Sequence, residues 1–170
     1  MTADVIIREV ASADEADVLA LYPRAFPDEN LTGVVQALFD EPSALSLVAV
    51  QGEKIVGHVA FTVCGVDSGD AEISLLGPLA VDPDMQRAGI GSALVREGLA
   101  QMGGRITCVF GDPAYYGRFG FRREDGIRTP CPIPDEMAFG WQAMIPEGVK
   151  PVTGTLTVPP CWQTASLWGG

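Results

Sequence analysis

Hydrophobic and polar residues alternate in several stretches of the chain, and this period-two pattern predicts β-strands. The alternation is found at residues 4–10, 46–50, 54–66 and 72–81. Short polar segments rich in glycine and acidic residues separate the last three stretches and are typical of hairpin turns. We therefore expect three consecutive antiparallel strands. Gly77-Pro78 interrupts the last of them and predicts a bulge or a splay, because proline cannot donate to a strand ladder.

Three other segments have a helical pattern. Ser12 with Glu15 resembles a capping box and predicts a helix over residues 13–21. A second short helix is expected over 31–40. A third is expected over 89–102, ended by Gly103-Gly104.

The second half of the chain has shorter elements. We expect a buried strand over 106–110 and one or two helical turns over 113–118. The pattern also predicts strands over 119–123, 138–145 and 155–158. Strands and helices do not alternate regularly along the chain, so the pattern favours an α+β sheet with helices on its faces over a doubly wound fold.

Composition and charge exclude several classes of protein. Hydrophobic residues make up 47% of the 170 residues and charged residues 19%, which excludes a disordered chain and fits one domain with its own core. No apolar run is long enough to span a membrane, and no secretory signal is visible at the N-terminus. The four cysteines are spaced singly, which is typical of free thiols in the cytoplasm rather than disulfides or a metal site.

The formal net charge of −11 argues against a nucleic-acid partner, which would need a basic face. Residues 1–86 contain fifteen acidic and three basic residues, whereas residues 87–170 contain seven acidic and eight basic ones. Seven arginines fall within residues 87–128. This window suggests a local anionic ligand, although an unevenly charged solvated surface would give the same counts.

The segment after the strand at 72–81 has the features of a phosphate site. Gly89 and Gly91 stand where a helix is expected to begin, so a ligand can approach the backbone, and the first helical N–H groups point outward. A Walker A loop is excluded because no Gly-Lys pair is present. A dinucleotide fingerprint fits poorly, because Leu94 occupies its third glycine position. The remaining pattern is Q-x-x-G-x-G, which begins at Gln86; glycines that only allow close helix packing are the alternative.

This Q-x-x-G-x-G run resembles the acyl-CoA pyrophosphate motif of the GNAT acetyltransferase superfamily. A second segment, G-D-P-x-Y-Y-x-R-F-G-F over residues 111–121, resembles another signature of that family, with Tyr116 four residues before Gly120. Together with Leu-Gly-Pro-Leu-Ala-Val at 76–81, these runs look like a bacterial subgroup of predicted N-acetyltransferases. The resemblance implies a GNAT-type mixed, mostly antiparallel sheet with helices on both faces and a splay at the acyl-CoA site. We expect this domain to span residues 1–145, with a C-terminal tail over 146–170 that packs on it and adds one short strand.

The resemblance also implies that acetyl-CoA is the co-substrate and that no metal is needed. In the family the pantetheine arm pairs with the strand before the motif, and backbone N–H groups of the motif hold the pyrophosphate. The backbone N–H of Val81 matches the donor to the thioester oxygen. The positions that match these roles are Leu79, Ala80, Val81, Gln86, Arg87, Ala88, Gly89, Ile90, Gly91 and Ser92.

Tyr116 matches the family's general acid, which would protonate the leaving thiolate; half-buried aromatic packing is the alternative. His58 and Glu72 are the candidate bases. His58 is the only histidine, and its position within a strand favours a hydrogen-bonded residue of the sheet over a base. Asp28 and Glu29 lie in the loop that borders the acceptor pocket in this family, where they would bind a cationic amine unless they are simply solvated.

These observations predict an N-acetyltransferase that moves the acetyl group from acetyl-CoA to a primary amine by direct attack in a ternary complex. The alternative is a catalytically idle acyl-CoA-binding or interaction module on the same fold. The expected partner is a small-molecule amine or a peptide amine, with no nucleic acid and no membrane. The pattern leaves open whether the protein is a monomer or a homodimer.

Overall fold

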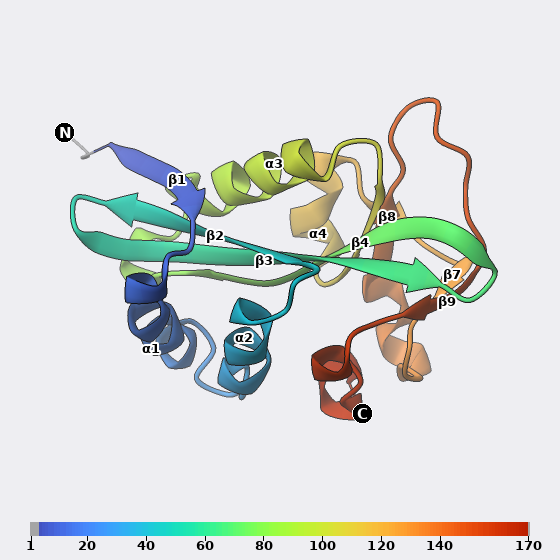
Figure 1. Cartoon of the computed structure of the whole chain (residues 1–170), viewed down its shortest axis with the longest axis horizontal. Coiled ribbons are helices and arrows are strands. Elements are labelled where there is room, and N and C mark those ends of the chain that lie inside the picture. Colours follow the sequence, from blue (N-terminus) through green and yellow to red (C-terminus); the bar gives the residue numbers. More distant parts are fainter. Residues whose placement is uncertain (1–3, 170) are drawn as a thin grey trace. The chain divides into compact units, whose positions relative to one another are not determined.

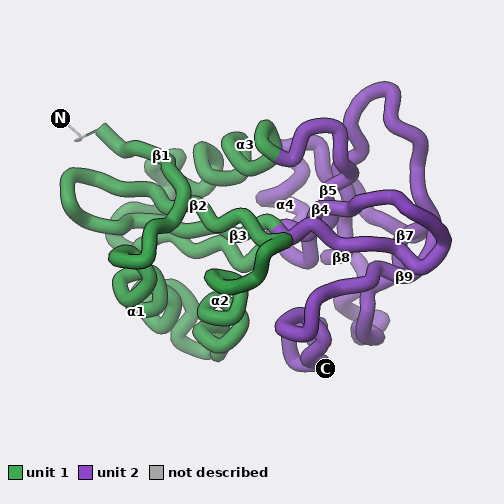
Figure 2. Tube along the Cα trace, viewed as in Figure 1, with its two compact units in different colours: residues 1–61, 77–101 green, residues 62–76, 102–170 purple. Residues whose placement is uncertain are grey.

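The computed structural model describes residues 4–169 of the chain, which form two compact units (Figure 2). Unit 1 contains the residues up to Phe61 together with residues 77–101. Unit 2 contains Thr62–Leu76 and the residues from Met102 onward. Two long strands, β3 (Lys54–Val66) and β4 (Gly69–Val81), have one part in each unit.

Unit 1 has a sheet with the strand order β1-β2-β3-β4. Strand β1 (Val5–Glu9) pairs antiparallel with β2 (Ala44–Gln51). Its helical elements are η1 (Ser12–Asp14), α1 (Glu15–Ala25), α2 (Thr32–Phe39), η2 (Pro83–Met85) and α3 (Ile90–Met102), whose last residue falls in unit 2. This order agrees with the pattern of strands and helices that the first half of the sequence predicts.

The helices of unit 1 cover both faces of its sheet (Figure 1). Neighbouring residues of a strand point to opposite faces, and Gly57 and His58 of β3 are such a pair. The His58 ring contacts Tyr22 of α1 and Phe39 of α2, at centroid distances of 5.6 and 6.2 Å. On the other face α3 packs so closely that a Cβ on Gly57 would lie 2.9 Å from Leu94 Cδ1. Glycine at this position therefore lets α3 lie directly on the strand.

In unit 2 the sheet continues as β4-β5-β8-β6, and β9 pairs with both β3 and β7. Strand β5 (Ile106–Phe110) is parallel to β4, whereas β8 (Trp141–Met144) is antiparallel to β5 and to β6 (Arg122–Arg123). The remaining elements are α4 (Pro113–Tyr116), η3 (Gly117–Phe119), β7 (Ile127–Arg128), η4 (Asp135–Gly140), β9 (Gly154–Thr157), η5 (Pro160–Trp162) and η6 (Ala165–Trp168). The α+β class with a mixed, mostly antiparallel sheet is thus confirmed.

The C-terminal segment packs into the core of unit 2. Its strand β9 was expected over 155–158 and begins one residue earlier. Trp162 donates from Nε1 to Thr62 Oγ1 at 3.3 Å, and Trp168 donates from Nε1 to the carbonyl of Trp162 at 2.9 Å. Trp168 is buried and stacks on Phe110, with ring centroids 6.1 Å apart.

Three local predictions were wrong. The capping box at Ser12 and Glu15 is absent, because Ser12 lies inside η1 and the Asp14 carboxylate accepts the Ala11 N–H at 2.7 Å instead. The strand expected over 119–123 is reduced to β6, since the chain turns at Gly120 with a φ of 92°. The strand expected over 138–145 begins only at Trp141, because η4 occupies the preceding residues. In the described part of the chain, no helix has the length and apolar character needed to cross a membrane.

Candidate functional site

The end of β4 differs from the rest of this strand. Its register with β5 runs from Ile73–Ile106 to Leu76–Val109. The next residue, Gly77, has a φ of 136°, and the Gly77–Pro78 peptide bond is cis. The strand nevertheless continues to Val81, so the predicted interruption is a Gly-Pro step inside one strand. Beyond this step Leu79 and Val81 are partly exposed and Ala80 is buried.

The turn between η2 and α3 is exposed and has an unusual backbone. Arg87 has a φ of 66° and Gly89 a φ of 83°, both in the left-handed region that side chains other than glycine rarely adopt. Gln86 links this turn to the strand, since its Nε2 donates to the carbonyl of Val81 at 3.5 Å. The backbone from Gln86 to Gly89 is thus presented to solvent.

Helix α3 begins with N–H groups that have no helical acceptor. The Ala93 N–H donates to the carbonyl of Gly89, the residue before the helix, at 3.0 Å. The N–H groups of Ile90, Gly91 and Ser92 precede this bond and therefore have no i−4 carbonyl within the helix. Together with the helix dipole they create a positive potential at the turn, which suits a phosphate.

A buried carboxylate fixes the start of the turn, and the sequence analysis missed it. Asp82 is fully buried, and its two carboxylate oxygens accept bonds from the Arg24 guanidinium at 2.8 and 3.1 Å. It also accepts the Asp84 N–H at 2.9 Å and lies 3.4 Å from Lys54 Nζ. Burial alone would raise the pKa of Asp82, but these donors outweigh it and lower the pKa below its ordinary value. An aspartate before a proline signals a cap, but no sequence pattern identifies partners 28 and 58 residues away.

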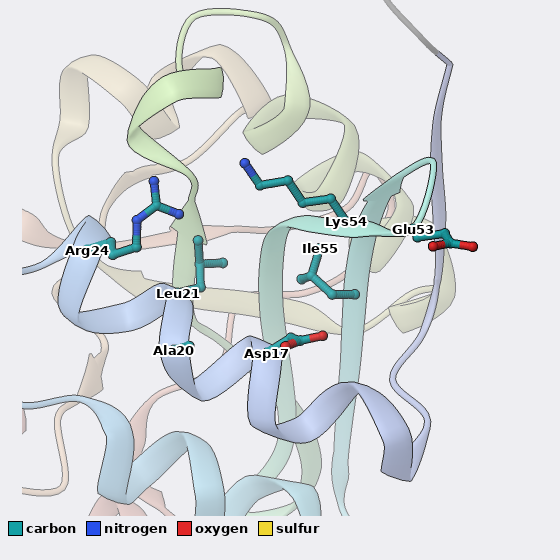
Figure 3. A pocket seen from close by; sticks show the side chains of 7 residues that line it. All are labelled: Asp17, Ala20, Leu21, Arg24, Glu53, Lys54 and Ile55. Atoms are coloured by element: carbon teal, nitrogen blue, oxygen red, sulfur yellow. The ribbon is translucent and has the colours of Figure 1, made fainter.

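A pocket of about 490 Å³ opens beside this cluster (Figure 3). Arg24 and Lys54 line it and point toward the same side of it, and Asp17 and Glu53 contribute acidic side chains. The other lining residues are Ala20, Leu21 and Ile55. None of the residues that the sequence analysis selected lines this pocket.

Tyr116 lies in unit 2, at the end of α4. Asp112 caps this helix by accepting the Ala114 N–H at 2.9 Å, and Gly111 leaves room for the Tyr116 ring, because a Cβ there would lie 2.5 Å from Cε2. The ring makes edge contacts with Tyr115 and Phe121, at centroid distances of 5.0 and 5.7 Å. Burial, together with nearby Tyr115 and Asp112, raises the pKa of the Tyr116 phenol. The phenol therefore keeps its proton at neutral pH.

His58 lies in unit 1 and is fully buried beneath α1 and α2. Its Nδ1 shares a hydrogen bond with Tyr22 Oη at 2.7 Å, and among the described residues its Nε2 has no partner. Burial lowers the pKa of His58 to about 3, so the ring is neutral in the physiological range.

The acidic candidates are exposed. Glu72 of β4, in unit 2, forms an ion pair with Arg105 at 3.0 Å. Asp28 and Glu29 lie in the loop between α1 and α2, in unit 1. The structure therefore places the turn, His58 and this loop in unit 1, and Tyr116 and Glu72 in unit 2. Within residues 4–169, no cluster of three or more potential metal ligands occurs.

The mixed sheet, with a glycine-containing turn between a strand and the N-terminus of a helix, defines the chain as an α+β protein with a phosphate-suited turn. Comparison with known proteins specifies the class. Residues 15–121 match the acetyltransferase (GNAT) family. The chain therefore belongs to the GNAT acetyltransferase family, and its class of activity is N-acetyl transfer.

Two relatives from Escherichia coli support this assignment. The chain is 34% identical over 141 residues to the uncharacterized N-acetyltransferase YjhQ of strain K12, covering 76% of this chain and 77% of YjhQ. It is 31% identical over 156 residues to the uncharacterized N-acetyltransferase YhbS, covering 88% and 93% of the two chains.

Two crystal structures have the same fold. YhbS from E. coli in complex with CoA has a TM-score of 0.84 at 28% identity, covering 96% of this chain and 94% of that one. A GNAT family acetyltransferase from Brucella melitensis in complex with acetyl-CoA has a TM-score of 0.75 at 29% identity, covering 93% and 97%.

Proposed function

We propose that this protein transfers the acetyl group of acetyl-CoA to a primary amine by direct attack within a ternary complex. The observation that carries the proposal is the turn before α3, where Arg87 and Gly89 adopt left-handed conformations and the helical N–H groups that follow lack internal acceptors. A pyrophosphate satisfies such N–H groups and neutralises their potential. The complexes of the two similar acetyltransferases with CoA and acetyl-CoA support the choice of ligand.

In this proposal the backbone of residues 87–92 binds the pyrophosphate, with the exposed Arg87 side chain available to its oxygens. Leu79 and Val81 pair with the pantetheine arm, because the pairing of β4 with β5 ends at Leu76 and leaves these two residues without a partner in β5. The Val81 N–H donates to the thioester oxygen and stabilises the charge that develops there.

The acetyl transfer needs one proton to be delivered. The amine nitrogen attacks the thioester carbonyl carbon, the C–S bond then breaks, and the departing sulfur takes a proton. We assign this proton to Tyr116, whose ring contacts Tyr115 and Phe121 in unit 2. Its raised pKa keeps the phenol protonated and able to donate over the physiological pH range.

The base is assigned less directly, and His58 and Glu72 remain its candidates. An imidazole whose pKa is about 3 takes up a proton from an ammonium group poorly, so burial favours a structural role for His58. Glu72 is held by Arg105 at 3.0 Å on the exposed first part of β4. If either side chain is the base, kcat should rise with pH as that side chain loses its proton, and His58→Asn or Glu72→Gln should remove this rise.

For the acceptor we propose a cationic small-molecule amine or a basic peptide terminus. Residues 1–86 carry fifteen acidic and three basic residues, and a field of this sign concentrates cations. Asp28 and Glu29 are exposed in the loop between α1 and α2 and are the proposed contacts. We also propose a cytoplasmic location, since the four cysteines are free.

The test is thiol release from acetyl-CoA in the presence of a panel of free amines and peptide N-termini. We expect release that depends on the amine and saturates with acetyl-CoA, with mass spectrometry detecting the acetylated amine. Binding of acetyl-CoA by calorimetry without thiol release for any amine would favour a catalytically idle acyl-CoA-binding module. Absence of binding would contradict the proposal altogether.

A further inference from the structure

The cluster around Asp82 joins three segments of unit 1 that are distant in sequence. Arg24 comes from the end of α1, Lys54 from the start of β3, and Asp82 from the residue that follows β4. The Asp82 N–H in addition donates to the carbonyl of Val56 at 2.9 Å. Both the backbone and the side chain of Asp82 are thus fixed.

A buried carboxylate is costly unless it is paired and hydrogen-bonded, so this arrangement is stable only as a complete set. Asp82 is fully buried, whereas the side chains of Arg24 and Lys54 retain 48% and 59% of their exposure. The two cations therefore stay hydrated on one side while they compensate the carboxylate on the other. Replacing Arg24 or Lys54 therefore removes a partner of Asp82 without opening a cavity in the core.

The cluster lies at one end of the strained turn. Asp82 caps η2 through the Asp84 N–H, and Arg87 follows with a φ of 66°. The other end of the turn is fixed by α3, whose Ile90 and Leu94 pack against the backbone at Gly57. A left-handed arginine persists only where the surrounding structure enforces it. Two fixed ends supply this constraint.

We propose that Asp82, together with Arg24 and Lys54, is a positioning cluster that holds the turn of residues 87–92 in the conformation that binds the pyrophosphate of acetyl-CoA. The inference rests on the proposed function. Asp82 acts through the backbone of the turn and does not contact the cofactor. Loosening the cluster misplaces several N–H donors at once, and we expect about a 10- to 100-fold loss of CoA affinity.

The experiment compares Asp82→Asn with Asp84→Asn, two residues further along. Asp84 is 79% exposed and lies 3.4 Å from Arg24, so its variant removes a nearby charge without touching the buried carboxylate. CoA is titrated into each protein while amide NMR spectra are recorded. The same titration is made with pantetheine, which lacks the pyrophosphate. In the wild type we expect CoA to shift the amide signals of residues 87–92. Asp82→Asn should weaken CoA binding and reduce these shifts, with pantetheine binding unchanged and Asp84→Asn close to wild type.

Arg24→Gln and the double variant Arg24→Gln/Asp82→Asn complete the test. If Asp82→Asn does not fold, Arg24→Gln takes its place, and weaker CoA binding with unchanged pantetheine binding is the expected result. If Arg24 acts through Asp82, the double variant should bind CoA with the same affinity as the single variant that binds CoA less tightly. If Arg24 contacts the phosphates itself, the two losses add, which contradicts the proposal. Unchanged CoA affinity in a folded Asp82→Asn also contradicts it. A wild type that binds no CoA would instead reject the proposed function.

Discussion

The two units hold their candidate site residues in place in different ways. In unit 1 polar contacts hold the start of the turn before α3, chiefly the Asp82–Arg24 pair with bonds of 2.8 and 3.1 Å. In unit 2 the Tyr116 ring is fixed by apolar contacts with Tyr115 and Phe121 and by the space that Gly111 leaves. The first arrangement leaves backbone N–H groups at the start of α3 without helical acceptors, and the second raises the pKa of a phenol.

This difference fits the chemistry that we propose for each group. A doubly charged pyrophosphate is bound best by N–H groups in a rigid backbone, and buried ion pairs with several hydrogen bonds fix a backbone firmly. A general acid must keep its proton until the sulfur departs, and an apolar environment favours its neutral form. Changes in unit 1 should therefore affect mainly acetyl-CoA affinity, and changes around Tyr116 mainly turnover.

The largest expected effect is on turnover in Tyr116→Phe. The change removes one hydroxyl and leaves the ring contacts, so kcat should fall by roughly 10²- to 10⁴-fold if the phenol is the acid. The KM for acetyl-CoA should stay within about threefold of wild type. Steady-state thiol release checks both values, and Tyr115→Phe is the matched control. Equal turnover in Tyr116→Phe would assign the ring a packing role only.

Gly89→Glu should affect binding instead of turnover. Gly89 has a φ of 83° and no neighbouring atom within 4 Å of a Cβ, so a side chain there points into open space next to the turn. A carboxylate close to the pyrophosphate should weaken acetyl-CoA binding by about 10³-fold, given the several kcal/mol of repulsion between near charges at a protein surface. Calorimetry measures this loss.

Gly89→Ala separates the charge from the backbone effect, because it has the same strain at positive φ and no carboxylate. We expect it to bind acetyl-CoA far more tightly than Gly89→Glu. If both variants fold and bind like the wild type, the pyrophosphate is not held by this turn, and the contrast between the units fails.

The buried histidine of unit 1 predicts a pH-dependent stability. The pKa of His58 is about 3 in the folded protein and close to the ordinary 6.5 in the unfolded chain, which therefore binds more protons between these values. The free energy of unfolding should fall as the pH drops below about 6.5. Between pH 7 and 5 this loss should be roughly 2 kcal/mol larger for the wild type than for His58→Asn.

Chemical denaturation of both proteins at the two pH values measures this difference, in which the contributions of the carboxylates cancel. Equal pH dependence in the two proteins would show that the ring accepts protons without opening the fold. For kcat, a structural role of His58 predicts the same pH profile in the two proteins, whereas a base role predicts that His58→Asn loses the rise of kcat with pH.

The smallest expected effect concerns the acceptor. If the acidic first part of the chain attracts a cationic amine, kcat/KM for cationic amines should fall by on the order of tenfold from low to high salt. Neutral amines should show little change. Asp28→Asn/Glu29→Gln should reduce the salt dependence for cationic amines and leave the KM for acetyl-CoA unchanged. A preference for anionic amines would contradict the proposed substrate class.

Local patterns determined much of this protein. The strand over 106–110 was predicted at its observed bounds, and the helix that begins after Gly89 was placed within one residue, because alternation and glycine punctuation act over a few neighbours. The same local signals pointed to the turn of residues 86–92. They failed at Ser12, where the Asp14 carboxylate, paired with Arg8 at 2.6 Å, replaced the expected cap.

Contacts between distant segments were decided only by the tertiary structure. The sequence marks Asp82 as a residue before a proline and His58 as one polar residue in a strand, and neither pattern shows a partner. The fold brings Arg24 and Lys54 to the carboxylate, and it buries His58 against Tyr22 and Phe39. Because desolvation and ion pairing depend on which segments meet, the charge states of these two residues follow from the packing of helices on the sheet and not from the order of residues along the chain.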